Sequence, residues 1–133
     1  MTIFVDTAAL YAFLDADDAN HAECEREWRR LLEHGEPLVT SNYVVVETCA
    51  LVQHRLGVQA VRDLQEVMLP ALQVLWVDEQ AHREAVSALL TAGRRELSLV
   101  DCASFGLMRK WGITSAFTLD RHFDEQGFRR LPD

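Results

Sequence analysis

Short apolar runs alternate along this chain with longer segments in which apolar residues recur at helical spacing. The short runs are rich in β-branched and aromatic residues, and they predict strands at residues 2–5, 37–40, 73–77 and 113–117, with a short edge strand at 128–131. The longer segments predict helices at residues 7–14, 20–34, 41–56, 58–68, 78–90 and 98–112. Residues 15–19 form a polar turn between the first two helices.

Several residues mark where these helices begin and end. Asn20, with Glu23 three positions later, has the pattern of a capping box. Ser41 and Asp78 are each a good N-cap for the helix that follows. Pro70 is expected to lie beyond the end of the helix at 58–68, because proline cannot continue a helix interior.

The alternation of strands with helices predicts the fold class. Such an order favours parallel strands joined by right-handed crossovers, and therefore a three-layer α/β/α sandwich with a central, mostly parallel sheet. The first strand is expected at the centre of the sheet, with its carboxyl end at the ligand-binding crevice. Residues 1–133 contain no linker or repeat, and we expect a single domain.

Four acidic residues stand in apolar surroundings. Asp6 and Asp120 each follow a predicted strand. Glu47 and Asp101 lie on predicted helices that enter the same edge of the sheet. A lone buried carboxylate is costly, so each acid needs a partner, and one or two divalent cations with oxygen ligands would satisfy all of them. Acids around such ions suit hydrolysis of a phosphodiester.

Each acid also has a simpler interpretation. Asp6 could only cap the helix that follows it. Asp101 could only pair with Ser98 in a capping box. Glu47 could face solvent, although its apolar neighbours make that harder to sustain, and Asp120 could be a turn residue.

Neighbours of the acids could support the same site. The hydroxyls of Thr7, Ser98 and Thr118 are candidates for orienting a carboxylate or a water, with caps and turns as the alternative. His122 could contact substrate or be an ordinary half-buried histidine. Asp124 could ligate metal or position water, or be a solvated charge.

Composition limits the possible partners. The net charge of −8 argues against tight passive binding of nucleic acid, but it does not exclude a nuclease whose acids hold metal. The basic residues that could contact a phosphate backbone are Arg94, Arg95, Arg109, Lys110, Arg121, Arg129 and Arg130. Three cysteines without a C-x-x-C pattern indicate free thiols in a reducing compartment, hence a cytoplasmic location, and no apolar run is long enough to span a membrane.

Taken in order, five segments resemble the PIN-domain family, and most closely its VapC-type toxin ribonucleases of bacterial toxin–antitoxin pairs. The matching segments are residues 5–12, 17–21, 46–48, 97–104 and 118–123, which span almost the whole chain. None of these motifs is specific alone, but their ordered set is.

The resemblance implies that Asp6, Glu47, Asp101 and Asp120 are the catalytic, metal-binding acids, with Mg²⁺ or Mn²⁺ as cofactor. It implies endonucleolytic cleavage of RNA by an activated water attacking in line, leaving 5′-phosphate and 3′-hydroxyl ends. It further implies a homodimer and a cognate antitoxin that inhibits the toxin. Asp120 occupies the family's most variable position.

Two other classes of function stay open. One is a non-catalytic PIN-fold module that binds a partner or regulatory DNA, which metal binding would discriminate. The other is a phosphatase or receiver domain phosphorylated on Asp6. Against the phosphatase, position 8 is Ala8 where a second acid would be needed. Against the receiver, no acidic pair lies beside the first strand.

Overall fold

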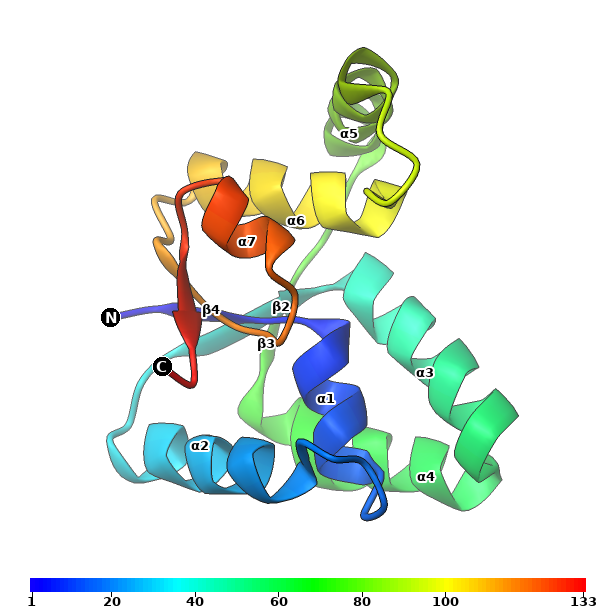
Figure 1. Ribbon diagram of the computed structural model, residues 1–133, viewed down its shortest axis with the longest axis vertical. Coiled ribbons are helices and arrows are strands. Elements are labelled where there is room, and N and C mark those ends of the chain that lie inside the picture. The colour runs from blue at the N-terminus through cyan, green and yellow to red at the C-terminus, as the bar shows by residue number, and fades with distance from the viewer.

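The computed structural model describes all residues, 1–133, and contains a five-stranded sheet with helices on both faces (Figure 1). All neighbouring strands are parallel, in the order β3-β2-β1-β4-β5. The strands are β1 (Ile3–Val5), β2 (Leu38–Ser41), β3 (Gln73–Leu75), β4 (Ser115–Phe117) and β5 (Arg129–Leu131). The predicted three-layer architecture and the central position of the first strand are confirmed.

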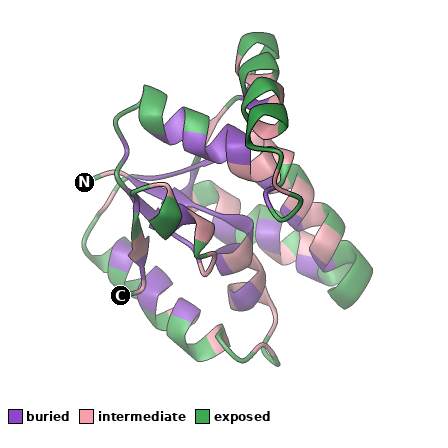
Figure 2. Cartoon of the chain, turned by 45° about the horizontal axis from the view of Figure 1, so that its top comes forward, coloured by how far each residue is buried: buried purple, intermediate pink, exposed green.

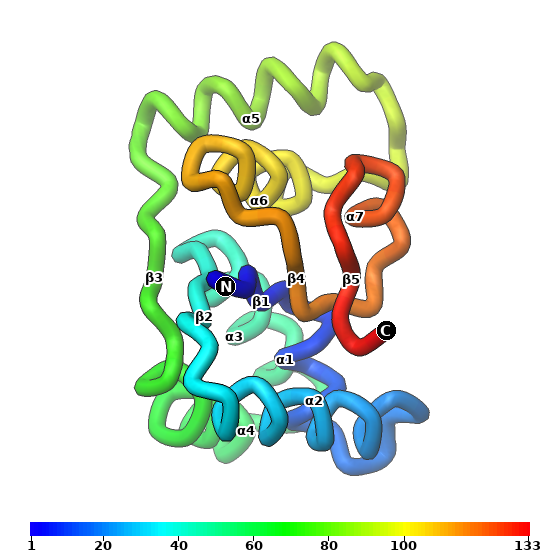
Figure 3. The backbone as a smooth tube through the Cα atoms, turned by 90° about the vertical axis from the view of Figure 1, so that its left-hand side faces the viewer, coloured from blue at the N-terminus to red at the C-terminus, as the bar shows by residue number.

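Seven α-helices connect these strands. They are α1 (Thr7–Leu14), α2 (His21–Glu33), α3 (Asn42–Leu56), α4 (Val58–Asp63), α5 (Glu79–Ala92), α6 (Leu99–Lys110) and α7 (His122–Glu125). Helices α1, α2 and α4 cover one face of the sheet, whereas α5, α6 and α7 lie on the other (Figures 1 and 3). Helix α3 packs against α1 beside the carboxyl ends of the strands. No helix combines the length and the apolar character that crossing a bilayer requires.

The apolar core lies between the sheet and its two helical layers (Figure 2). All three residues of β1 are fully buried, which explains why this run is apolar without alternation. Cys24 belongs to this core, and Cys102 belongs to a smaller apolar cluster between α5 and α6. Both therefore act as small apolar side chains.

The strand order reverses direction beside β1. The chain builds β1, β2 and β3 outward on one side and then returns to place β4 on the other side of β1. Val5 pairs with Phe117, so the residues that follow these two strands emerge side by side. Open α/β sheets bind ligands at such a switch point, outside the carboxyl ends of the strands. Asp6 and Thr118 are the residues that emerge there.

The predicted helix caps are confirmed in two cases and wrong in one. Ser41 accepts a hydrogen bond from the Val44 amide at 3.1 Å, and Asp78 accepts one from the Ala81 amide at 2.9 Å. Asn20 precedes α2 as predicted, but its side chain makes no capping hydrogen bond. The Asn20 amide instead donates to Asp18 Oδ1 at 2.8 Å, because the polar turn before it is closed by its own aspartates.

Other differences concern the ends of elements. Helix α4 continues as a π-helical turn, η1 (Leu64–Met68), and a 3₁₀ turn, η2 (Leu69–Ala71), which includes Pro70 in its first turn, where proline needs no amide donor. The third strand ends at Leu75 and not at Val77, since the Val77 amide donates to Asn42 Oδ1 at 2.6 Å and leaves the sheet. Helix α7 was not predicted from the sequence, because its four residues are too few to show a periodicity.

Candidate active site

Asp6 is the buried centre of the candidate site. It follows β1 at the N-cap position of α1, is 4% exposed, and its side chain makes no capping hydrogen bond. Its Oδ2 instead accepts a hydrogen bond from the Thr118 hydroxyl at 2.8 Å. Capping therefore does not explain this carboxylate, which faces the end of the neighbouring strand β4.

Thr118 links two of the predicted acids. Its hydroxyl donates to Asp6 and accepts the Asp120 backbone amide at 3.0 Å. The Thr118 amide is itself held by the Leu131 carbonyl of β5 at 3.1 Å. One fully buried hydroxyl thus fixes the carboxylate of Asp6 relative to the loop that carries Asp120.

Asp101 takes part in a complete capping box at the start of α6. Its Oδ2 accepts the Ser98 amide at 3.1 Å, and its own amide donates to the Ser98 hydroxyl at 3.0 Å. The other carboxylate oxygen, Oδ1, has no hydrogen bond. Asp101 can therefore cap the helix with one oxygen and offer the second to a ligand.

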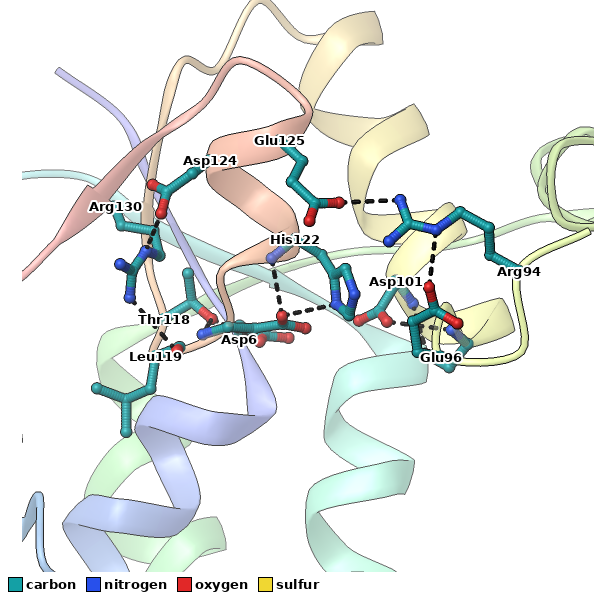
Figure 4. Close-up of polar contacts among 12 residues, drawn as sticks. Asp6, Arg94, Glu96, Asp101, Thr118, Leu119, His122, Asp124, Glu125 and Arg130 are labelled. Carbon is teal, nitrogen blue, oxygen red and sulfur yellow. Dashed lines mark hydrogen bonds and ion pairs between the residues drawn. The ribbon is translucent and has the colours of Figure 1, made fainter. Parts of the chain in front are cut away.

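Asp120 lies close to Asp101 and also to His122. Single ligand atoms of these three residues all lie within 4.8 Å of one another. Asp120 Oδ1 accepts the His122 backbone amide at 2.9 Å and lies 2.8 Å from His122 Nδ1. Figure 4 shows Asp6, Asp101 and His122 gathered at the ends of β1 and β4, beside the start of α6.

Glu47 is not one of the three residues whose ligand atoms lie within 4.8 Å of one another. It lies on α3, is half-buried, and forms no hydrogen bond or ion pair. The neighbouring Thr48 is the residue that faces inward, and its hydroxyl donates to Thr7 at 3.3 Å. The apolar neighbours of Glu47 do not all turn inward, since Val46 is 67% exposed, and Glu47 itself is neither fully buried nor fully solvated.

Burial and mutual repulsion raise the pKa of two acids of the site, Asp6 and Asp101. Burial, reinforced by the charges of Asp101 and Asp120 and opposed by the Thr118 hydrogen bond, raises the pKa of Asp6 from 3.8 to about 7. Burial also raises the pKa of Asp101, with the Asp120 charge adding to it and the Ser98 amide opposing it. Without a cation, ionised carboxylates at this position are therefore unfavourable.

The surrounding charges are mostly paired among themselves. Asp124 binds Arg130 at 2.8 Å, and so it points away from the group around Asp101 (Figure 4). Arg94 bridges Glu96 and Glu125, each at 2.9 Å, and ties the loop before α6 to α7. These contacts hold the two segments that carry the acids.

The residues fit a hard divalent cation. Carboxylate oxygens of Asp101 and Asp120 converge at the switch point, and one oxygen of Asp101 is unengaged. A bound cation would favour the ionised form of Asp6, whose pKa is raised to about 7. A groove of about 870 Å³ between α5 and α6 is lined by none of the predicted acids. The site is therefore defined by its chemistry and not by its volume.

Thr118→Val should weaken divalent-metal binding roughly tenfold to a hundredfold, because outer hydrogen bonds orient carboxylate ligands. Valine removes both the donor to Asp6 and the acceptor for the Asp120 amide while keeping the shape of the side chain. Calorimetric titration with Mn²⁺ would measure the loss. Thr118→Ser keeps the hydroxyl and should bind like the parent chain, and equal weakening in both variants would contradict the role of the hydroxyl.

Comparison with known proteins agrees with this arrangement. The PIN domain family model matches residues 3–129. The 23S rRNA-specific endonuclease VapC20 of Mycobacterium tuberculosis is 35% identical over 127 residues, which cover 95% of each chain. Ribonuclease VapC26 of the same organism is 29% identical over 126 residues, covering 91% of this chain and 89% of the relative.

Solved structures give the same family. The crystal structure of Mycobacterium tuberculosis VapC20, described as a sarcin–ricin loop cleaving toxin, superimposes with a TM-score of 0.83 at 34% identity over 95% of both chains. FitAcB from Neisseria gonorrhoeae shares the fold, with a TM-score of 0.69 at 17% identity over 98% of this chain and 96% of that one. On the match to the family model and the similarity to VapC20, this chain belongs to the PIN-domain family, within its VapC-type group.

Proposed function

We propose that this protein is a metal-dependent endoribonuclease, the toxin of a toxin–antitoxin pair, with residues 1–133 acting as one catalytic domain. The observation that carries the proposal is the buried carboxylate of Asp6 beside the convergent ligand atoms of Asp101 and Asp120 at the switch point. The similarity to VapC-type ribonucleases supports it.

The chain's own residues have distinct tasks in this reaction. Asp6, Asp101 and Asp120 would hold Mg²⁺ or Mn²⁺, which when bound neutralises charge on the phosphoryl group and makes a water more acidic. Thr118 and Ser98 keep the carboxylates oriented through their hydrogen bonds. The products would be 5′-phosphate and 3′-hydroxyl ends.

Glu47 and Thr7 have less structural support. Glu47 has no partner that holds it away from a substrate, and we propose that it orients the attacking water or joins the metal when RNA is bound. Thr7 accepts the Thr48 hydroxyl, which ties the first turn of α1 to α3. It would keep the neighbouring Asp6 in place.

Two arginines near the acids are free to bind the RNA backbone. Arg95, in the loop before α6, and Arg121, between Asp120 and His122, are exposed and form no ion pair or hydrogen bond. Arg94, Arg129 and Arg130 are instead engaged by carboxylates of the protein. The free pair therefore offers local positive charge on a chain whose net charge is −8.

Arg95→Ala and Arg121→Ala should each raise KM for RNA, since each loses about one phosphate contact. For the same reason, the slope of the logarithm of the RNA-binding constant against the logarithm of the salt concentration should become shallower by about one unit. Binding of Mn²⁺ should not change. Arg83→Ala is the matched control, because Arg83 is exposed on α5 and paired with Glu79. Salt-dependent binding curves that match the parent chain for both variants would contradict the assignment.

The function is tested by cleavage of RNA with the purified chain. The sarcin–ricin loop of 23S rRNA, the target named for VapC20, is the first substrate to try. We expect cleavage with Mg²⁺ or Mn²⁺, none with EDTA, and a loss of at least roughly a hundredfold in Asp101→Asn. Cleavage that survives EDTA, or equal cleavage by Asp101→Asn, would overturn the mechanism.

The alternative is a PIN-fold module without catalysis, and a calorimetric titration that detects no metal binding would favour it. We also expect a homodimer, a cognate antitoxin and a cytoplasmic location, in line with family membership. Partners of this kind would cover the large apolar side chains at the surface. These exposed side chains include Val46, Val58, Trp76, Leu90 and Trp111.

A further inference from the structure

The imidazole of His122 is placed in an unusual way. Its Nδ1 is shielded from solvent and has no hydrogen-bond partner, although it lies 2.8 Å from Asp120 Oδ1. The two atoms are close enough for an ion pair when the ring is protonated, but Oδ1 already accepts a hydrogen bond from the His122 backbone amide. A shielded polar atom without a partner requires an explanation.

The separation of the two atoms suits joint coordination of a cation. Neighbouring ligands of an octahedral ion with bonds of about 2.1 Å lie about 3 Å apart. The Nδ1–Oδ1 distance of 2.8 Å is close to that spacing. One carboxylate oxygen of Asp101, one of Asp120 and one ring nitrogen of His122 all lie within 4.8 Å of one another, so the three side chains can face one ion.

The position of the ring is set by the fold. His122 opens α7, and the next residue, Phe123, is fully buried against Phe105 at a ring-centroid distance of 4.9 Å. The His122 amide is bound by Asp120, whose own amide is bound by the Thr118 hydroxyl. The ring is thus held beside the acids by a chain of contacts that begins at Asp6 (Figure 4).

We propose that His122 is a further metal ligand, which binds the ion of the active site through Nδ1 alongside Asp101 and Asp120. This inference rests on the proposed metal-dependent function and adds one ligand to the metal site. A ligand set of oxygens alone suits Mg²⁺, whereas an imidazole nitrogen favours transition-metal ions. The site should therefore select Mn²⁺ over Mg²⁺ more strongly than its carboxylates alone would.

Pulsed electron paramagnetic resonance of the full chain with Mn²⁺ tests the bond directly. We expect hyperfine coupling between Mn²⁺ and a directly bound histidine nitrogen. The size and pattern of this coupling should change when ¹⁵N-histidine replaces ordinary histidine in the chain. The coupling should disappear in His122→Ala and persist in His34→Ala, whose exposed ring contacts only the Arg30 carbonyl. If His122→Ala does not fold, the coupling in the parent chain decides the question.

Calorimetry supplies a second readout. His122→Ala should lower Mn²⁺ affinity at least about tenfold and Mg²⁺ affinity less than about threefold. Bound Mn²⁺ without nitrogen coupling, or equal losses for both ions, would overturn the ligand and leave His122 as an ion-pair partner of Asp120. That outcome leaves the proposed function intact, whereas absence of metal binding together with metal-independent cleavage would overturn both.

Discussion

Asp6→Asn should abolish RNA cleavage, by about a thousandfold, and at the same time stabilise the metal-free protein. Asparagine loses the negative charge that a cation needs, and losses of this size are typical when a charge-stabilising group at a reacting centre is removed. The neutral amide also avoids the cost of ionising a buried carboxylate beside Asp101 and Asp120. Its carbonyl can still accept the Thr118 hydroxyl.

The stabilising effect follows from the raised pKa of Asp6. A change from 3.8 to about 7 corresponds to about 4 kcal/mol between the protonated and ionised forms, part of which asparagine should recover at pH 7.5. Urea denaturation in EDTA should show a gain of roughly 1–3 kcal/mol in the free energy of unfolding, with little change in slope. Asp63→Asn, which alters an exposed carboxylate on α4, is the control. Asp6→Asn that is less stable than the parent chain would contradict the electrostatic account.

Such a result would mean that Asp6 supports catalysis at the expense of the stability of the metal-free protein. Site residues commonly reduce stability because their charges are arranged for a ligand and not for the fold. Saturating Mn²⁺ should stabilise the parent chain by mass action and leave Asp6→Asn nearly unchanged. The difference in the free energy of unfolding between the two proteins should therefore become smaller, or change sign, when metal is added.

Much of the architecture could be predicted from the sequence because its determinants are local. Fully buried parallel strands such as Ile3–Val5 are continuous apolar runs, and residues such as Ser41 cap helices by contacts three positions away. Where the prediction failed, a tertiary contact or a short length was responsible. The third strand ends early because the Val77 amide finds Asn42, which is 35 residues away.

For the candidate site, the sequence predicts which strand ends lie side by side. Asp6 and Asp120 follow strand ends and Asp101 lies in the first turn of a helix, and the fold brings the three together. Glu47 shows the limit of that reasoning, since its distance from the others depends on how α3 is rotated. The proposed role of His122 as a metal ligand could not be predicted from the sequence, because it depends on the direction of the side chain, which no local pattern reveals.

Without metal, the protein should lose stability as the pH rises from about 4 to about 7. Asp6 binds its proton more tightly in the folded chain than in the unfolded chain, so between these two pKa values the folded state carries more protons. Stability therefore falls with rising pH, by at most about 1.4 kcal/mol per pH unit from this residue. The raised pKa of Asp101 acts in the same direction.

Three carboxyls act in the opposite direction at more acidic pH, because hydrogen bonds lower their pKa values: the half-buried Asp15 and the exposed Glu96 and Asp133. Their weak, solvent-screened contacts should offset little of the fall in stability that Asp6 causes between about pH 4 and about pH 7. The free energies of unfolding measured by urea denaturation in EDTA at pH 5 and pH 7 should differ by roughly 2–3 kcal/mol, and Asp6→Asn should remove most of that difference. Saturating Mn²⁺ should cancel the fall, because the ion binds only the ionised carboxylate. A metal-free chain that becomes more stable over this range would show that Asp6 is ionised in the fold and that its burial is compensated by something other than a proton.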